Sequence, residues 1–234
     1  MCSVFRAGGS SKPKIRVVDT ETIELNGIEV DVIDFSSDLL PSGDPFGHYD
    51  QNEQMLVQSL WHDLSGTNSS LGPIKYINGE DSVTAFSQTL AAGCCYFAER
   101  RNGYSSDRVE KYHSERKEVW TGAGSAYLAK LFSKKPSDTS LLDDSSSWVD
   151  NTNSIASGRR VMRTRKGYFV LGPPCAMVGD TVCVLFGGKT PYCLRRVENC
   201  YRLVGECYVY GLMNGEAIHM MDQRVLEEKT FSLE

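Results

Sequence analysis

The 234-residue sequence has no long apolar run and no recognisable export signal. Its longest uncharged apolar stretch, 181–188, is far shorter than the roughly 18 residues that a membrane-spanning helix needs. The first residues lack the apolar segment of a signal peptide. We therefore expect a soluble, cytoplasmic protein that does not contact a membrane.

The sequence also lacks the short motifs of metal and redox sites. None of the eight cysteines stands in C-x-x-C spacing, and none of the four histidines belongs to an H-E-x-x-H motif. Adjacent Cys94 and Cys95 do not readily form a disulfide without strain. We expect reduced thiols, no metal, no cofactor and no catalytic residue, with an enzyme using a Cys/His or carboxylate site between helices and barrel as the alternative.

The phosphate-binding P-loop motif is incomplete. Gly187, Gly188, Lys189 and Thr190 resemble its end, but Cys183 stands where the motif requires a glycine. A proline and a predicted strand follow, whereas the motif must lead into a helix. These residues therefore predict a hairpin turn.

Charge is present but unevenly distributed. Residues 1–157 carry a net charge of −8 and residues 158–234 carry +3, within a total of −5. The basic part suggests an acidic protein partner, and the candidate partner-binding residues are Arg195, Arg196 and Arg202.

A second basic group forms a candidate basic edge: Arg159, Arg160, Arg163, Arg165 and Lys166. Tyr168 and Phe169 follow it, so a nucleic-acid-binding small barrel is another alternative. A solvated edge strand explains the same charges, and the acidic composition favours that simpler interpretation. Nucleic acid is therefore an unlikely partner, and the oligomeric state is unknown.

Apolar residues alternate with polar ones in residues 1–40, which predicts two or three short strands. Asn26 and Gly27 lie between two alternating runs, and this dipeptide favours a tight hairpin turn there. Five further strands are predicted in residues 159–234, separated by glycine-rich turns.

The middle of the chain differs in pattern. Residues 41–132 show helical periodicity, with helices expected from Asp50, over 81–101 and over 106–132. Residues 133–158 are rich in Ser, Asp and Asn and predict a polar linker, with Trp148 and Ile155 as local anchors. The fold class is therefore α+β: a small antiparallel β-barrel-like unit, joined by the N-terminal strands, with an inserted helical bundle.

Three motifs carry a family resemblance. They read T-x-x-G-Y-x-x-L-G-P from Thr164, G-D-x-V-C-V-L-x-G-G-x-x-P-x-x-L-R from Gly179, and Y-x-L-V-G-E-x-Y-V-x-G-x-M-x-G-E from Tyr201. They resemble the C-terminal region of fungal heterokaryon-incompatibility (HET domain) proteins. The family's N-terminal HET domain, with its D-P-R-D-K segment, is absent from this sequence.

This resemblance implies a role in self/non-self recognition and incompatibility cell death. Because chemistry in the family has been associated with the missing domain, we transfer no activity to this chain. The favoured function is a non-enzymatic accessory or protein-interaction module of a heterokaryon-incompatibility-type protein.

Overall fold

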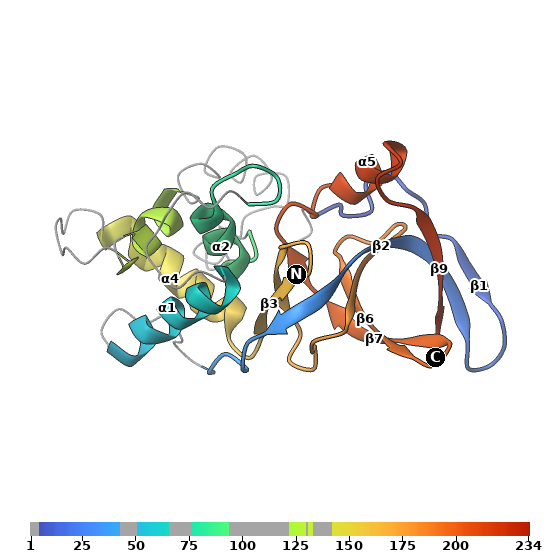
Figure 1. The fold of residues 1–234 in the computed structure, drawn as a ribbon, viewed down its shortest axis with the longest axis horizontal. Coiled ribbons are helices and arrows are strands. Elements are labelled where there is room, and N and C mark those ends of the chain that lie inside the picture. Colours follow the sequence, from blue (N-terminus) through green and yellow to red (C-terminus); the bar gives the residue numbers. More distant parts are fainter. Residues whose placement is uncertain (1–4, 43–50, 66–75, 94–121, 130, 133–141) are drawn as a thin grey trace, which may run out of the picture. The chain divides into compact units, whose positions relative to one another are not determined.

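The computed structural model describes residues 5–42, 51–65, 76–93, 122–129, 131–132 and 142–234. Contacts divide the chain into two compact units. The barrel unit comprises Met1–Asp38 and Arg159–Glu234, and the helical unit comprises Leu39–Gly158. The chain thus leaves the barrel unit after β2 and returns to it at β3 (Figure 1).

The barrel unit is built from short strands and one short helix, α5 (Glu216–Asp222). Its strands are β1 (Ile15–Val17), β2 (Ile23–Ser36), β3 (Arg160–Thr164), β4 (Phe169–Gly172), β5 (Thr181–Leu185), β6 (Tyr192–Val197), β7 (Cys200–Glu206), β8 (Tyr208–Val209) and β9 (Glu228–Leu233). This mixed architecture confirms the predicted α+β fold class.

Five of these strands close into a ring in the order β2-β5-β6-β7-β9-β2 (Figure 1). All neighbours are antiparallel except β7 and β9, which are parallel and meet at the single pair Tyr201↔Leu233. The ring is therefore barrel-like without being a regular barrel. The predicted joining of N-terminal and C-terminal strands is confirmed, since β2 pairs with both β5 and β9.

The ring encloses an apolar core contributed by four strands. Its buried residues are Cys183, Leu185, Leu194, Tyr201, Phe231 and Leu233. The rings of Tyr201 and Phe231 meet edge to face at 5.3 Å between centroids, a favoured aromatic geometry. Alternation along each strand places these side chains inside, as the period of two requires.

The hairpin turn predicted at Asn26 and Gly27 is wrong, because β2 runs through both residues. The chain reverses instead between β1 and β2, where the Asp19 carboxylate accepts hydrogen bonds from the backbone of Glu21 and Thr22. Gly27 is needed for close approach: a Cβ there would lie 2.5 Å from the Val184 carbonyl oxygen. The glycine therefore permits the β2–β5 pairing.

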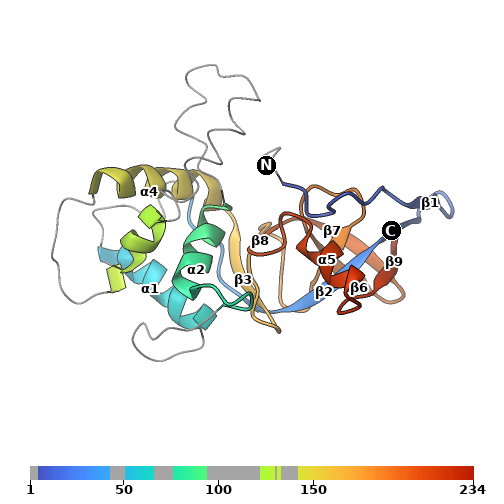
Figure 2. The ribbon, with the colours of Figure 1, turned by 90° about the horizontal axis from the view of Figure 1, so that it is seen from above.

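The helical unit contains α1 (Gln51–Ser65), α2 (Ser82–Leu90) and α4 (Leu142–Ala156), with further helical residues at 122–129 and 131–132. In α1, the predicted apolar positions Leu60, Trp61 and Leu64 are buried. The predicted start of this helix at Asp50 lies outside the described residues. Helices α2 and α4 lie side by side in both views (Figures 1 and 2).

Helix α2 is shorter than the sequence predicts. Asp81 caps its start by accepting from the Thr84 amide at 2.9 Å. The helix ends at Leu90 rather than near Arg101, because Ala92 and Gly93 take positive φ and the Gly93 amide turns back to the Gln88 carbonyl. Residues 94–121, including most of the third predicted helix, lie outside the described residues.

Residues 142–156 form helix α4, whereas the sequence predicts a polar linker over 133–158. Its apolar anchor is Trp148, which is 1% exposed. Gly124 lies against the indole of Trp148 so closely that a Cβ would be 2.5 Å from Nε1. Thr152 and Asn153 are also buried, so the buried face of this helix includes polar residues and cannot be recognised from composition.

Sequence patterning missed the last two elements, α5 and β9. The other predicted C-terminal strands are present, although the run from Tyr201 to Tyr210 is divided into β7 and β8. Within the described residues, none of the helices has the length and apolarity required to cross a membrane.

Candidate functional site

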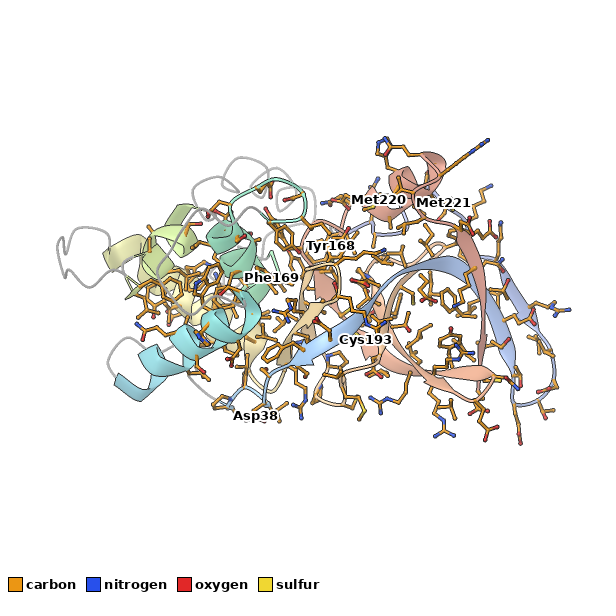
Figure 3. The ribbon with its side chains drawn as sticks, in the orientation of Figure 1. Asp38, Tyr168, Phe169, Cys193, Met220 and Met221 are labelled. Carbon is orange, nitrogen blue, oxygen red and sulfur yellow. The ribbon has the colours of Figure 1, made fainter. Side chains whose placement is uncertain are left out.

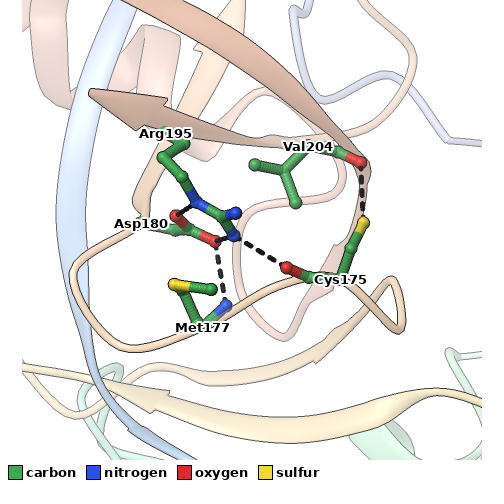
Figure 4. A network of polar contacts seen from close by, with 5 residues as sticks. All are labelled: Cys175, Met177, Asp180, Arg195 and Val204. Atoms are coloured by element: carbon green, nitrogen blue, oxygen red, sulfur yellow. Dashed lines mark hydrogen bonds and ion pairs between the residues drawn. The ribbon is translucent and has the colours of Figure 1, made fainter. Parts of the chain in front are cut away.

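Arg195 on β6 lies in a polar network with the buried carboxylate of Asp180 (Figure 4). Its Nε and one terminal nitrogen donate to the two oxygens of Asp180 at 2.8 and 2.9 Å, and that terminal nitrogen also donates to the Cys175 carbonyl at 2.7 Å. The Met177 amide donates to the same carboxylate. The hydrogen bond to Asp180 raises the pKa of Arg195, so this guanidinium stays charged and fastens the 173–180 turn to β6.

The other two candidate partner-binding arginines are more accessible. Arg202 on β7 lies opposite Arg195 in the strand register, and its side chain is 64% exposed. It meets Glu234 at 3.4 Å, and Arg196 donates to the Glu198 carbonyl at the same distance. The β6–β7 hairpin thus exposes Arg196 and Arg202, which the strand register places on its two opposite faces, while Arg195 serves the fold.

Several side chains of the basic edge form hydrogen bonds or ion pairs within the barrel unit. Arg160 donates to the carbonyls of Pro174 and Ser37, each at 2.7 Å. The other engaged residues are Arg163, paired with Asp34, and Lys166, bonded to the Val30 carbonyl. Arg165 is exposed and Arg159 is half-buried.

The aromatic residues after this edge are not displayed for stacking. Tyr168 and Phe169 are 6% and 5% exposed, and the Tyr168 hydroxyl points to Met220 at 4.0 Å from sulfur (Figure 3). Burial, together with nearby Asp31 and Glu216, raises the pKa of Tyr168. A base-stacking platform at these two rings would require them to leave the core.

Sequence comparison matches the strand-rich part of the chain to a known domain. The model of the Het-6 beta-barrel domain matches residues 133–226. This stretch of the chain is similar to the Het-6 beta-barrel domain. A 63-residue segment is 41% identical to heterokaryon incompatibility protein 6, OR allele, of Neurospora crassa, covering 25% of this chain and 9% of that protein. No solved structure matches the chain.

The Het-6 match confirms the resemblance to the C-terminal region of heterokaryon-incompatibility proteins. Its boundaries differ from those of the barrel unit, which also takes β1 and β2 from the N-terminal part of the chain. The chain spans under a tenth of the length of the curated relative, so the activity of that whole protein is not established for this chain.

The cysteines that the structure describes are free thiols, and three of them are fully buried: Cys183, Cys193 and Cys207. Burial raises the pKa of Cys183 well above its usual value. A hydrogen bond with Cys193, together with burial, does the same for Cys207. Because the thiolate is the nucleophile, the thiols of Cys183 and Cys207 react slowly near neutral pH.

The two histidines that the structure describes, His62 and His219, are exposed. His219 contacts Gln223 at 2.8 Å, and His62 lies 3.4 Å from Asp63. His48 and His113 lie outside the described residues. Among the residues that the structure describes, no three His, Cys, Asp or Glu side chains are grouped to hold a metal ion.

We expect the buried thiols of the barrel unit to react with alkylating reagents more slowly than the exposed thiol of Cys175. In the native protein Cys175 should be alkylated first, while Cys183, Cys193 and Cys207 should react only after denaturation. Mass spectrometry of natively purified, then denatured and alkylated protein should show eight modified thiols. Recovery of a bridged pair without added oxidant would contradict this expectation.

A polar network at the ring was missed by sequence reasoning. Lys229 on β9 is bonded to Glu29 on β2 and donates to the Tyr201 hydroxyl at 2.9 Å. Burial alone lowers the pKa of Lys229, but the bonds to Glu29 and Tyr201 outweigh burial and raise it. Glu29 is 200 positions from Lys229 and Tyr201 is 28 positions from it, so no local sequence signal reveals the network.

This network gives a pH-dependent contribution to stability. Because the folded-state pKa of Lys229 is raised, the contribution is present below the usual value of 10.5 and is lost as pH rises through the folded-state pKa. Lys229→Met should lower the free energy of unfolding by under about 1 kcal/mol near neutral pH, since the pair is partly exposed. Urea titrations of both proteins should give a difference that shrinks above pH 10.5; a difference that grows there would contradict this assignment.

Proposed function

We propose that the chain is a non-enzymatic interaction module of a heterokaryon-incompatibility-type protein, acting in self/non-self recognition and the cell death that follows incompatibility. The Het-6 match and the likeness to the Neurospora protein support the biological setting. The observation that carries the proposal is the β6–β7 hairpin, where Arg196 and Arg202 are exposed while Arg195 is held by Asp180.

The proposed ligand is an acidic strand or loop of another protein. Arg196 and Arg202 each have a guanidinium at the surface with long contacts of 3.4 Å, so they can turn to a carboxylate without breaking a short bond. Screening acts over about 8 Å at physiological ionic strength, so association should weaken as salt rises.

A paired charge-reversal experiment tests this surface. We expect the double variant Arg196→Glu, Arg202→Glu to lose at least tenfold of its capture of a protein partner from fungal extract, compared with the unmodified chain. Arg195 must be left unchanged, since Arg195→Glu would set a second carboxylate against buried Asp180.

The matched control is Arg159→Glu, Arg165→Glu, which reverses the same charge on the basic edge. Equal loss in both variants would show a general charge effect and contradict a specific hairpin surface. Loss of oligonucleotide binding only in the control would instead establish the nucleic-acid alternative. NAD-turnover and hydrolase assays test the non-enzymatic part: turnover abolished by one cysteine or carboxylate substitution would overturn it.

A further inference from the structure

Residues 5–13, here called the strap, lie against the barrel without belonging to a helix or strand. The strap passes beside the first part of α5 (Figure 1). Its amides donate to backbone carbonyls of the barrel: Arg6 to Met213 at 2.9 Å, Ala7 to Lys189 at 3.0 Å and Gly8 to Gly188 at 2.9 Å. In the opposite direction, the Gly187 amide donates to the Ser11 hydroxyl at 3.1 Å.

Glycines on both sides make this close approach possible. A Cβ on Gly8 would lie 2.9 Å from the Gly188 carbonyl oxygen, and a Cβ on Gly215 would lie 3.3 Å from the Cα of Gly9. A Cβ on Gly187 would overlap the ring of Pro13. The interface between the strap and the barrel, here called the seam, therefore accepts a segment with small residues at two successive positions and excludes larger residues there.

Two side chains of the strap are buried. Phe5 is buried with its ring 5.8 Å from that of Tyr208, and Ala7 is fully buried. Arg6, Ser10 and Lys12 are exposed. The barrel thus contacts the backbone of the strap together with one aromatic and one methyl side chain. The strap itself is turned, since the Gly9 amide donates to the Arg6 carbonyl and the Ser11 amide donates to the Gly8 carbonyl.

We propose that this seam is a peptide-binding groove of the barrel, whose ligand is a Phe-x-Ala-Gly-Gly segment in the turned conformation that the strap adopts here. The strap has no strand pairing and few buried apolar atoms, so it opens at a lower free energy than the ring. An opened groove takes the same segment from a separate molecule. This inference goes beyond the function proposed above and uses a different face of the chain.

The groove also accounts for the Gly187–Thr190 sequence that resembles the end of a P-loop. The carbonyls of Gly188 and Lys189 face the strap as hydrogen-bond acceptors, and the Gly187 amide is already bonded to Ser11. A phosphate requires converging amide donors, whereas this turn offers acceptors to a peptide. The described turn is therefore shaped for a backbone ligand.

The test uses the full chain with Gly8→Val, which places a side chain against Gly188 and displaces the strap while leaving the groove residues unchanged. A fluorescein-labelled peptide of residues 5–13 should bind this variant saturably, at one peptide per chain. It should bind the unmodified chain at least tenfold more weakly, because the tethered strap competes at an effective concentration of about 1 mM. Circular dichroism confirms that the variant is folded.

Two matched substitutions make the result specific. Ser10→Val adds the same side chain at an exposed strap position, so that chain should behave as the unmodified one. The peptide carrying Val in place of Gly8 should not bind the Gly8→Val chain. Failure of the unmodified peptide to bind the folded Gly8→Val chain would overturn the proposal.

Hydrogen exchange of the unmodified chain provides a second readout that needs no variant. We expect the amides of Arg6, Ala7, Gly8 and Gly187 to exchange at least tenfold faster than that of Cys183 in the ring. Exchange of strap and ring amides at one common rate would show that the strap opens only when the whole barrel unfolds. The groove would then never be empty in the folded protein, which would overturn the proposal. Neither readout depends on Arg196 or Arg202, so failure here is distinct from failure of the proposed function.

Discussion

Replacing Asp180 with alanine is expected to lower the free energy of unfolding by about 2–4 kcal/mol. The variant removes a 1%-exposed carboxylate that accepts two bonds from Arg195 and one from the Met177 amide. Loss of one partner leaves the other charge incompletely paired, and the one-third exposure of Arg195 moderates the cost. Urea denaturation followed by near-ultraviolet circular dichroism measures the change.

The matched control is Asp34→Ala, which breaks the ion pair between Asp34 and Arg163 at the surface of the same unit. Both of those side chains are about a third exposed, so we expect a loss of about 0–1 kcal/mol. Similar losses in the two variants would show that burial of Asp180 does not decide its contribution.

Gly27→Val is expected to cost about 3 kcal/mol, at the upper end of the range for overpacking. A Cβ at this position would lie 2.5 Å from the Val184 carbonyl oxygen and 2.9 Å from the Cα of Leu185. Both obstacles are backbone atoms of β5, so they cannot rotate away as a side chain could. The β2–β5 pairing that helps to close the ring must therefore shift, and denaturant titration should show the loss.

Gly122→Val is the control, since a Cβ at this exposed helical position meets no atom within 4 Å. Its effect should stay within about 0.5 kcal/mol. If Gly27→Val were equally mild, Gly27 would have to be a flexible position rather than a point of close approach.

The limits of sequence reasoning are clearest at glycine, which is used both in tight turns and where two strands approach closely. Asn26 and Gly27 favour a turn in local sequence, yet the glycine is required by a strand more than 150 residues later. Local preference cannot report such a contact. In contrast, short runs rich in Val, Tyr and Cys between turn residues predicted β5 and β6 closely, because these residues favour strands wherever the strands pair.

The same limit applies to the helical unit and to the candidate site. In α4, polar residues such as Thr152 are buried, so composition predicted a linker where a helix forms. At the site, sequence identified the cluster of arginines but not the buried partner of Arg195, which lies 15 positions earlier. Which arginine side chains are exposed and which are paired depends on tertiary structure. Of the three candidate partner-binding arginines, only Arg196 and Arg202 are therefore available at the surface of the hairpin.

Strand β2 also sets the order in which the ring is completed during folding. It pairs with β9, and Ile23 lies opposite Leu233, so one side of the ring forms only after the chain has been synthesised as far as β9. The intervening helical unit has its own buried core, and its contacts are closer in sequence. Local contacts form faster than distant ones. During synthesis we therefore expect the helical unit to fold before β2 has its partners, and the unpaired edge of β2 is prone to aggregation until β5 and β9 are made.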